Sequence, residues 1–178
     1  IGSSLVGSEM CIRDRSYPST QKVQTLLASR LFNIDKKFIL VGNGGAELIN
    51  ELGKYFDSKF NIFSPTFKEY EQKFKNITIN SIKSENFTSE VNKFLKKNFK
   101  RSGLILVNPD NPSGSFVEKK ELTDFISQNK EKPIIIDESF MDFAEKKLRY
   151  TLIDKSFLAK HKNVFVIKSI GKSYGTGG

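Results

Sequence analysis

Short apolar runs alternate with amphipathic segments along most of this chain, and this alternation restricts the fold more than any other feature. Six runs are apolar or β-branched over nearly their whole length, at residues 38–41, 60–63, 77–82, 104–107, 134–136 and 164–167. A strand with one face in water is apolar at every second position, whereas a strand covered on both faces is apolar throughout. The runs therefore predict strands of a sheet that is buried on both sides.

The segments between these runs have the spacing of helices with one apolar face. Apolar side chains recur three and four positions apart at residues 23, 26, 27 and 31, and again within 48–56, 91–95 and 122–126. Strands and helices in regular alternation are typical of a parallel sheet with helices on both faces. We therefore predict an α/β fold with three layers, helix, sheet and helix, around a mainly parallel sheet.

The loops after the predicted strands carry most of the residues with chemical functions. In parallel sheets the carboxyl ends of the strands meet at one edge, where ligands bind. The loops read Gly-Asn-Gly-Gly-Ala-Glu at 42–47, Ser-Pro-Thr-Phe at 64–67, Asn-Pro-Asp-Asn-Pro-Ser-Gly at 108–114, Asp-Glu at 137–138 and Lys-Ser-Ile-Gly-Lys at 168–172. Backbone amides, a carboxylate and a lysine amine are therefore expected at a single edge.

Each of these loops has an ordinary structural interpretation when it is taken alone. A glycine-rich turn before a helix is a common connection, and Asn-Pro marks turns whether or not a ligand binds there. Asp137 and Glu138 are also suited to cap a following helix, and a lone lysine such as Lys172 is usually a surface residue. The functional prediction therefore depends on the combination and order of the loops.

In this order, three motifs resemble those of the class I and II aminotransferase family. The sequence NPDNPSG at 108–114 is similar to the family's NPxNPTG, IIIDESF to its strand followed by DEAY, and the Ser-x-x-Lys-x-x-Gly-x-x-Gly stretch from Ser169 to its lysine motif. The resemblance covers residues 17–178. It implies the large domain of an enzyme that depends on pyridoxal 5′-phosphate (PLP).

The resemblance also implies how four side chains would treat the PLP ring. Lys172 would hold the cofactor as an aldimine and then move the Cα proton of the substrate as a base. Asp137 would pair with the pyridine nitrogen, Asn111 would donate to the phenolic oxygen, and Phe67 would stack on the ring face. Phe140 stands where the family usually has tyrosine, so the hydroxyl that normally donates to the ring oxygen is absent.

A second set of residues is implied for the cofactor phosphate. Gly45 and Ala46 would bind it through backbone N–H groups at the start of a helix, and Ser169 through its hydroxyl. Tyr17, from the family's Tyr-Pro motif, would reach the phosphate bound by a neighbouring subunit, which implies a homodimer. We assign no metal-binding residues.

The two ends of the chain differ from the part between them. Residues 1–15 show neither helical nor strand periodicity and resemble a translated sequencing adapter, so we interpret them as an artefactual tail. Residues 16–178 are then a partial large domain, truncated at the carboxyl end, without the last strand of the sheet and without the small domain. We expect such a fragment to be inactive alone.

Composition excludes several classes of protein. The formal charge is +9, but the lysines are scattered along the chain rather than gathered in a basic block, which argues against nucleic-acid binding. No run of about 18 apolar residues is long enough for a membrane span. The single cysteine, Cys11, agrees with a reducing compartment. We expect a cytoplasmic protein whose partners are small molecules.

The functional prediction is a PLP-dependent transaminase that moves an amino group from an amino acid, or an amino-phosphate compound, to a 2-oxo acid. A threonine-phosphate decarboxylase has the same large domain and stays open as an alternative. A non-catalytic PLP-binding sensor domain or an inactive remnant is an alternative of another class. A P-loop nucleotide hydrolase is disfavoured, because Val166 stands where its motif needs glycine.

Overall fold

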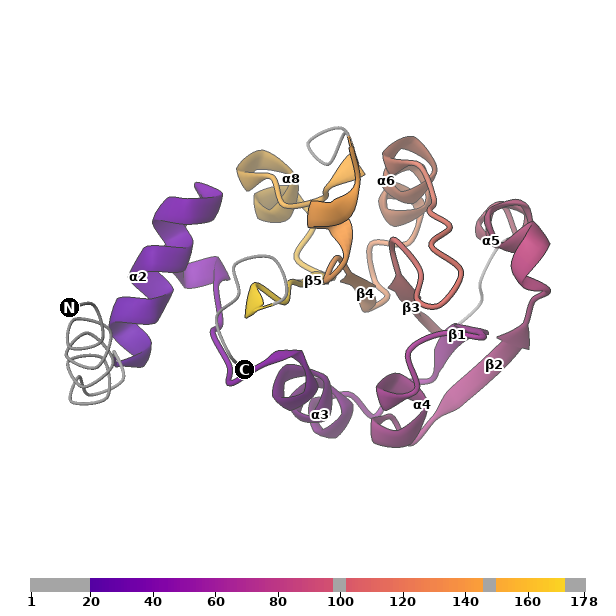
Figure 1. Cartoon of the computed structure of the whole chain (residues 1–178), viewed down its shortest axis with the longest axis horizontal. Helices are drawn as coiled ribbons and strands as arrows, with labels where there is room; N and C mark the ends of the chain where they lie inside the picture. The colour runs from indigo at the N-terminus through magenta and orange to yellow at the C-terminus, as the bar shows by residue number, and fades with distance from the viewer. Residues whose placement is uncertain (1–19, 98–101, 146–149, 172–178) are drawn as a thin grey trace, which may run out of the picture. The chain divides into compact units, whose positions relative to one another are not determined.

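Five parallel strands form the sheet in the computed structural model, which describes residues 20–97, 102–145 and 150–171 (Figure 1). The strands are β1 (Phe60–Ser64), β2 (Ile77–Ser81), β3 (Gly103–Val107), β4 (Ile134–Asp137) and β5 (Val164–Ile167), in the order β2-β1-β3-β4-β5. Every neighbouring pair is parallel. Five of the six predicted strands and the parallel arrangement are therefore confirmed.

Helices cover the sheet on both faces, which gives the three predicted layers (Figure 1). One face packs against α3 (Gly45–Tyr55) and α4 (Glu69–Lys73), whereas the other packs against α5 (Phe87–Leu95), α6 (Lys119–Gln128) and α8 (Lys155–Lys160). Short 3-10 turns lie at η2 (Ser84–Asn86) and η3 (Met141–Phe143). The α/β class is confirmed, although α4 and α8 are too short for the spacing of apolar residues to predict them.

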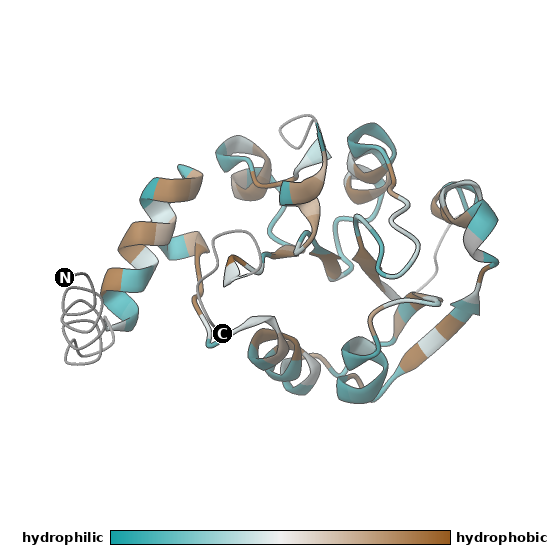
Figure 2. Ribbon diagram, viewed as in Figure 1, coloured by the Kyte–Doolittle hydropathy of each residue, from teal (hydrophilic) through white to brown (hydrophobic). Residues whose placement is uncertain are grey.

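The central strands are apolar throughout because successive side chains point to opposite covered faces. In β3, Leu104 and Leu106 belong to the core under α5 and α6, whereas Ile105 and Val107 belong to the core under α3 and α4. Figure 2 shows the hydrophobic colouring of these strands and of the inner sides of the helices. This alternation also sends the side chains at the end of β4 to different faces.

Strand β2 lies at one edge of the sheet and is less buried than the central strands. Ile79 is 51% exposed, and no residue of β2 is fully buried. The expectation that most runs are covered on both faces therefore holds for the central strands but not for this edge. None of the helices in the described ranges is both long enough and apolar enough to cross a membrane.

The run at residues 38–41 is not a strand, which corrects the sixth prediction. Lys36–Phe38 form a 3-10 turn, η1, whose first residues are held by the Asp35 side chain as it accepts from the Lys37 N–H at 3.1 Å. Leu40 is 69% exposed, whereas a strand inside a covered sheet would bury it. The capped 3-10 turn therefore takes up the first residue of the run, and residues 39–41 are not part of the described sheet.

The chain divides into two compact units, Ile1–Val41 and Gly42–Gly178. In the described part of the first unit, α2 (Gln21–Phe32) confirms the first predicted helix. It ends at Asn33, whose left-handed backbone (φ 53°) directs its N–H to the Ser29 carbonyl. No residue of α2 is buried within the structure. All the strands and the loops between them belong to the second unit.

Candidate functional site

The carboxyl ends of β3, β4 and β5 lie level with one another. Val107 pairs in register with Asp137, and Asp137 pairs with Ile167. Because the strands are parallel, the loops that follow them leave the sheet at the same edge, where ligands bind in such folds. The predicted convergence is therefore observed for the loops after these strands and after β1, whereas the loop at 42–47 follows no strand.

Asp137 is the buried carboxylate at the centre of this edge. It is 3% exposed, and its two oxygens accept hydrogen bonds from the Tyr70 hydroxyl at 2.7 Å and from the Ser139 N–H at 2.9 Å. No lysine or arginine of the described ranges lies within 4.0 Å of this carboxylate. A buried carboxylate normally has a charged partner. Its position thus suits a cationic group of a ligand.

Tyr70 is a residue of this site that sequence analysis missed. Its side chain is fully buried on α4, and its ring lies edge-on to Phe67 with centroids 6.4 Å apart. Burial and the neighbouring Asp137 raise the pKa of the Tyr70 hydroxyl well above its usual value, so it remains a donor. The sequence signal for Tyr70 was its position three residues after Phe67, a spacing at which two side chains can lie close together.

The loop after β3 contains two asparagines with different environments. Asn108 is buried, and its amide group donates to the Val117 carbonyl at 3.1 Å and accepts from the Val117 N–H at 2.7 Å. Asn111 is half-buried, and its side chain makes no hydrogen bond with other described residues. Asn108 therefore fixes the loop, whereas Asn111 keeps its donors and acceptor available to a ligand.

Asp110, between these asparagines, stiffens the same loop. Its carboxylate accepts from the Ser113 hydroxyl at 2.6 Å and from the Thr66 hydroxyl at 3.0 Å. The second bond connects the loop after β3 to the loop after β1, which also carries Phe67. The segments that carry Phe67 and Asn111 are thus tied together by a buried acid.

A cleft of about 620 Å³ separates the loop after β3 from the segment after β4. Asn111 and Phe140 both line it, so the structure brings these two predicted residues to one cavity. The other described lining is largely apolar and aromatic, and consists of Pro109, Asp110, Pro112, Gly114, Phe116, Phe143, Ala144, Glu145 and Tyr150. Neither Asp137 nor Phe67 is among its lining residues.

Glu138 follows Asp137 directly but belongs to the other face of the sheet. It is 1% exposed, and its oxygens accept from the Leu152 N–H at 2.6 Å and from the Thr151 hydroxyl. Burial raises the pKa of this carboxyl group, and the two hydrogen bonds oppose that effect. Glu138 thus anchors the segment before α8 and has no oxygen free of protein donors.

Lys168 and Asp142 form a shielded ion pair beside this anchor. The Lys168 Nζ lies 2.7 Å from the Asp142 Oδ2, and the two side chains are 10% and 14% exposed. The ammonium also donates to the Glu138 carbonyl at 3.4 Å. This pair connects the end of β5 to the segment after β4, close to Ser169.

The residues predicted to bind phosphate lie on two elements. Gly45 and Ala46 form the first turn of α3, after Gly44 with a positive φ of 88°, and a side chain added at Gly45 would meet nothing within 4 Å. Ser169 is half-buried just after β5. The first-turn N–H groups of a helix suit an anion. Lys172 and Tyr17 lie outside the described residues.

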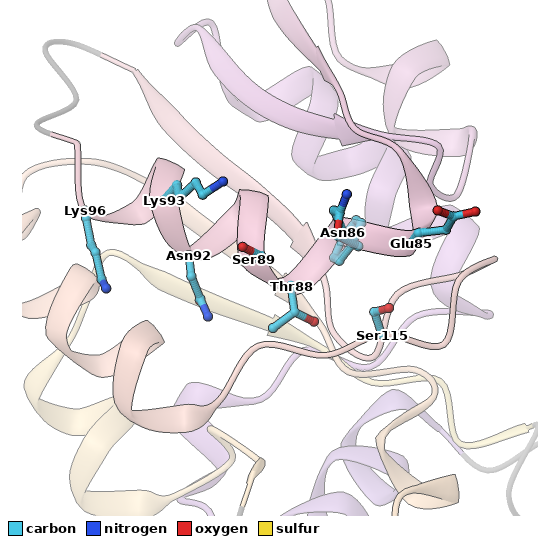
Figure 3. A pocket seen from close by; sticks show the side chains of 9 residues that line it. Glu85, Asn86, Thr88, Ser89, Asn92, Lys93, Lys96 and Ser115 are labelled. Atoms are coloured by element: carbon cyan, nitrogen blue, oxygen red, sulfur yellow. The ribbon is translucent and has the colours of Figure 1, made fainter.

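A second hollow, of about 560 Å³, lies at the start of α5 (Figure 3). Figure 3 shows polar side chains around it, among them Thr88, Asn92, Lys93 and Ser115. None of the predicted cofactor residues lines this hollow. We therefore place the candidate site at the edge of the sheet near Asp137.

Comparison with solved structures defines the class of fold to which this arrangement belongs. The crystal structure of L-threonine-O-3-phosphate decarboxylase from Porphyromonas gingivalis superposes with a TM-score of 0.74 at 21% identity, over 98% of this chain and 54% of that one. A histidinol-phosphate aminotransferase from Sinorhizobium meliloti, solved with pyridoxal 5′-phosphate, gives a TM-score of 0.68 at 15% identity, over 99% and 50% of the two chains. The fold is that of the PLP-transferase large domain, which these two enzymes share.

Sequence comparison identifies the family. The profile described as "Aminotransferase class I and II" matches residues 13–178, and the chain belongs to this family of PLP-dependent enzymes. An L-serine phosphate decarboxylase of Campylobacter jejuni is 32% identical over 171 residues, which are 91% of this chain and 44% of that protein. A histidinol-phosphate aminotransferase of Pyrococcus furiosus is 27% identical, over 84% and 43%. The chain thus spans about half the length of such relatives.

The described residues fit the cofactor of this family. PLP has a ring nitrogen that can be protonated, an aromatic face, a phenolic oxygen and a phosphate, and each needs a different kind of partner. The buried Asp137 carboxylate has no cation among the described residues, Phe67 is a half-buried aromatic ring, and Asn111 has an amide available in the cleft. The donor set is therefore suited to PLP.

Proposed function

We propose that this chain carries the PLP-binding part of an enzyme that acts at the Cα of an amino compound. The observation that carries the proposal is the environment of Asp137. Its carboxylate is buried, is held by two protein donors and has no cation among the described residues, so a protonated ring nitrogen would complete its interactions. Membership of the family supports the same cofactor.

In this proposal each of several residues has a different role at the PLP ring. When bound, PLP acts as the electron sink for the carbanion at Cα. Asp137 holds the proton on the ring nitrogen, Asn111 donates to the phenolic oxygen, and Phe67 covers one ring face. Lys172 would hold the cofactor through a covalent bond and would transfer a proton at Cα. Phe140 provides no hydroxyl, so of these two cleft residues only Asn111 donates to the ring oxygen.

The phosphate is assigned to a separate group of residues. Gly45 and Ala46 offer the N–H groups of the first turn of α3, and Ser169 offers a hydroxyl beside the end of β5. Tyr17 completes the phosphate site of a second subunit, so we propose a homodimer. Light scattering of the protein in solution would show a monomeric mass if the dimer is wrong.

For the reaction, we propose decarboxylation of a phosphorylated amino acid as the first candidate. Two relatives named as serine- and threonine-phosphate decarboxylases are 32% and 31% identical to this chain and a further L-serine phosphate decarboxylase is 26% identical, whereas histidinol-phosphate aminotransferases are 25–29% identical. In decarboxylation the bond from Cα to the carboxylate breaks, carbon dioxide leaves, and a proton replaces it. Transfer of the amino group to a 2-oxo acid is the second candidate, supported by the aminotransferase relatives.

The cofactor proposal is tested by reductive trapping in the full-length protein. Borohydride reduction in the presence of PLP should leave a phosphopyridoxyl group on the peptide that contains Lys172, and Lys172→Ala should abolish it. If the wild-type protein incorporates no such group, the proposal is wrong. A label on another lysine would instead reassign the attachment.

The reaction is tested by its products. Incubation with L-serine phosphate or L-threonine phosphate should release carbon dioxide and the corresponding phosphorylated amine without any 2-oxo acid. If a new 2-oxo acid appears only when a second 2-oxo acid is supplied, and no carbon dioxide is released, the protein is a transaminase. The two outcomes differ in which bond at Cα breaks, a choice set by substrate orientation.

A further inference from the structure

The contact between Tyr70 and Asp137 connects two elements that are distant in sequence. The Tyr70 hydroxyl, on α4, donates to Oδ2 of Asp137, at the end of β4, over 2.7 Å and across 67 residues of sequence. Both side chains are buried. Oδ1 of the same carboxylate accepts from the Ser139 N–H at 2.9 Å. The carboxylate therefore has one donor on each oxygen, and its rotation is restricted.

The surroundings of Tyr70 show what the hydroxyl contributes beyond filling space. Its ring lies in an apolar cluster and is flanked by Phe67 and Phe74, with centroids 6.4 and 6.2 Å away. A phenylalanine would pack in the same cluster, so the ring alone does not require a hydroxyl. The hydroxyl has a single role among these contacts, which is to donate to Asp137.

Donors on both oxygens of a buried carboxylate hold it in one orientation. No cation among the described residues lies near Asp137, so the Tyr70 hydroxyl and the Ser139 N–H are the groups that hold it within this part of the chain. The same Tyr70 ring touches Phe67, the proposed cover of the cofactor ring. Tyr70 thus contacts both groups that would hold the cofactor ring from different directions.

We propose that Tyr70 is a positioning residue for PLP, whose hydroxyl fixes the orientation of the Asp137 carboxylate toward the ring nitrogen. The inference rests on the proposed role of Asp137 at that nitrogen. Tyr70 itself acts through Asp137 and through the edge of Phe67. Removing the hydroxyl should therefore weaken cofactor binding without disturbing the packing of α4.

The first test is the affinity of the full-length apo-protein for PLP, followed by absorbance. Tyr70→Phe should raise the Kd about tenfold or more, because a hydrogen bond to a charged group is lost. Tyr55→Phe is the matched control, since Tyr55 is 76% exposed at the end of α3 and its hydroxyl has no carboxylate partner in the described part of the chain. An unchanged Kd in Tyr70→Phe would show that Tyr70 only fills the core.

A second measurement distinguishes positioning from packing. In the Asp137→Ala background, Tyr70→Phe should cause no further loss of affinity, whereas additive losses would overturn the proposal. Substituting para-fluorophenylalanine at position 70 preserves the volume without the donor, and para-aminophenylalanine restores a donor, so only the second should recover wild-type affinity and absorbance. If the two analogues behave alike, the proposal fails. Comparing them tests the proposal even if Tyr70→Phe does not fold.

The result also separates this inference from the proposed function. If wild-type protein binds PLP and Asp137→Ala weakens that binding, the role of Asp137 stands whatever Tyr70→Phe does. If wild-type protein binds no PLP, the proposed function is wrong, and the inference falls with it. A specific failure of the Tyr70 proposal therefore appears as a wild-type Kd in a protein that still depends on Asp137.

Discussion

Asp137 and Glu138 are consecutive carboxylates at the end of one strand, and both are almost completely buried. Strand geometry points them to opposite faces of the sheet. Asp137 reaches Tyr70 on the side of α3 and α4, whereas Glu138 reaches Leu152 and Thr151 on the side of α6 and α8. Two residues of the same chemical type thus lie in two different parts of the molecule.

The difference teaches that residue type and burial do not identify a binding carboxylate. Glu138 accepts from two groups of one segment, which it holds in place, and burial raises its pKa. Asp137 accepts from two groups on separate elements, and its charge has no cationic partner in the described ranges. The charge that lacks a partner is the one that suits a ligand.

The largest expected effect is a difference in turnover between variants of the two carboxylates. In the full-length protein, Asp137→Asn should lower turnover about 10³-fold, because a neutral amide no longer stabilises a protonated ring nitrogen. Glu138→Gln should reduce turnover less than about tenfold when the protein remains folded. Steady-state kinetics under cofactor saturation measure both. Equal losses in the two variants would remove the functional distinction between these neighbours.

The next largest effect concerns stability, to which Glu138 should contribute more than Asp137. Glu138→Ala leaves the buried Leu152 N–H and the Thr151 hydroxyl without their acceptor, which should lower the free energy of unfolding by about 3 kcal/mol. Glu51→Ala, at an exposed ion pair with Lys54, is the control and should change it far less, because solvent screens exposed ion pairs. Urea unfolding gives both values. A loss below 1 kcal/mol at Glu138 would contradict the anchoring role.

Sequence analysis predicted the strand that carries these two carboxylates but not the side chains that they contact. Strand β4 and the position of Asp137 at its end followed from three isoleucines before a charged pair, because a covered strand must be apolar. Tyr70 and Thr151 could not be assigned to these carboxylates, since their pairing depends on how distant elements pack. The proposed roles of Lys172 and Tyr17 stay predictions, as both residues lie outside the described ranges.

The wrong strand at residues 38–41 has a different cause. Its apolar pattern resembles that of β5, which was predicted with its observed bounds, Val164–Ile167. The two runs differ in what precedes them, because Asp35, three residues before Phe38, caps a 3-10 turn that ends at Phe38. Local hydrogen bonding of a polar side chain competes with extended structure, and an apolar pattern alone does not report it.

The same division of roles recurs in the two asparagines of the loop after β3. Asn108→Ala removes both hydrogen bonds to Val117 and should lower the free energy of unfolding by about 2 kcal/mol. Asn111→Ala should leave stability unchanged but raise the Kd for PLP about fivefold, through loss of one donor to the ring oxygen. Thermal unfolding and cofactor titration test the pair. A large stability loss at Asn111 would show that its side chain is structural.

The smallest expected effect is the pH dependence that Glu138 gives to the free energy of unfolding. The pKa of Glu138 is raised by burial above its ordinary value of 4.5, so the folded protein binds this proton more tightly than the unfolded chain does. Its contribution to stability is complete below pH 4.5 and is lost as the pH rises through the folded-state pKa. Glu138→Gln cannot titrate. The difference in unfolding free energy between wild type and variant should therefore move against the wild type as the pH rises above 4.5, while the contributions of other acids cancel. A difference that is flat across this range would mean that Glu138 is already ionised in the fold at no cost, and that the hydrogen bonds from Leu152 and Thr151 fully offset its burial.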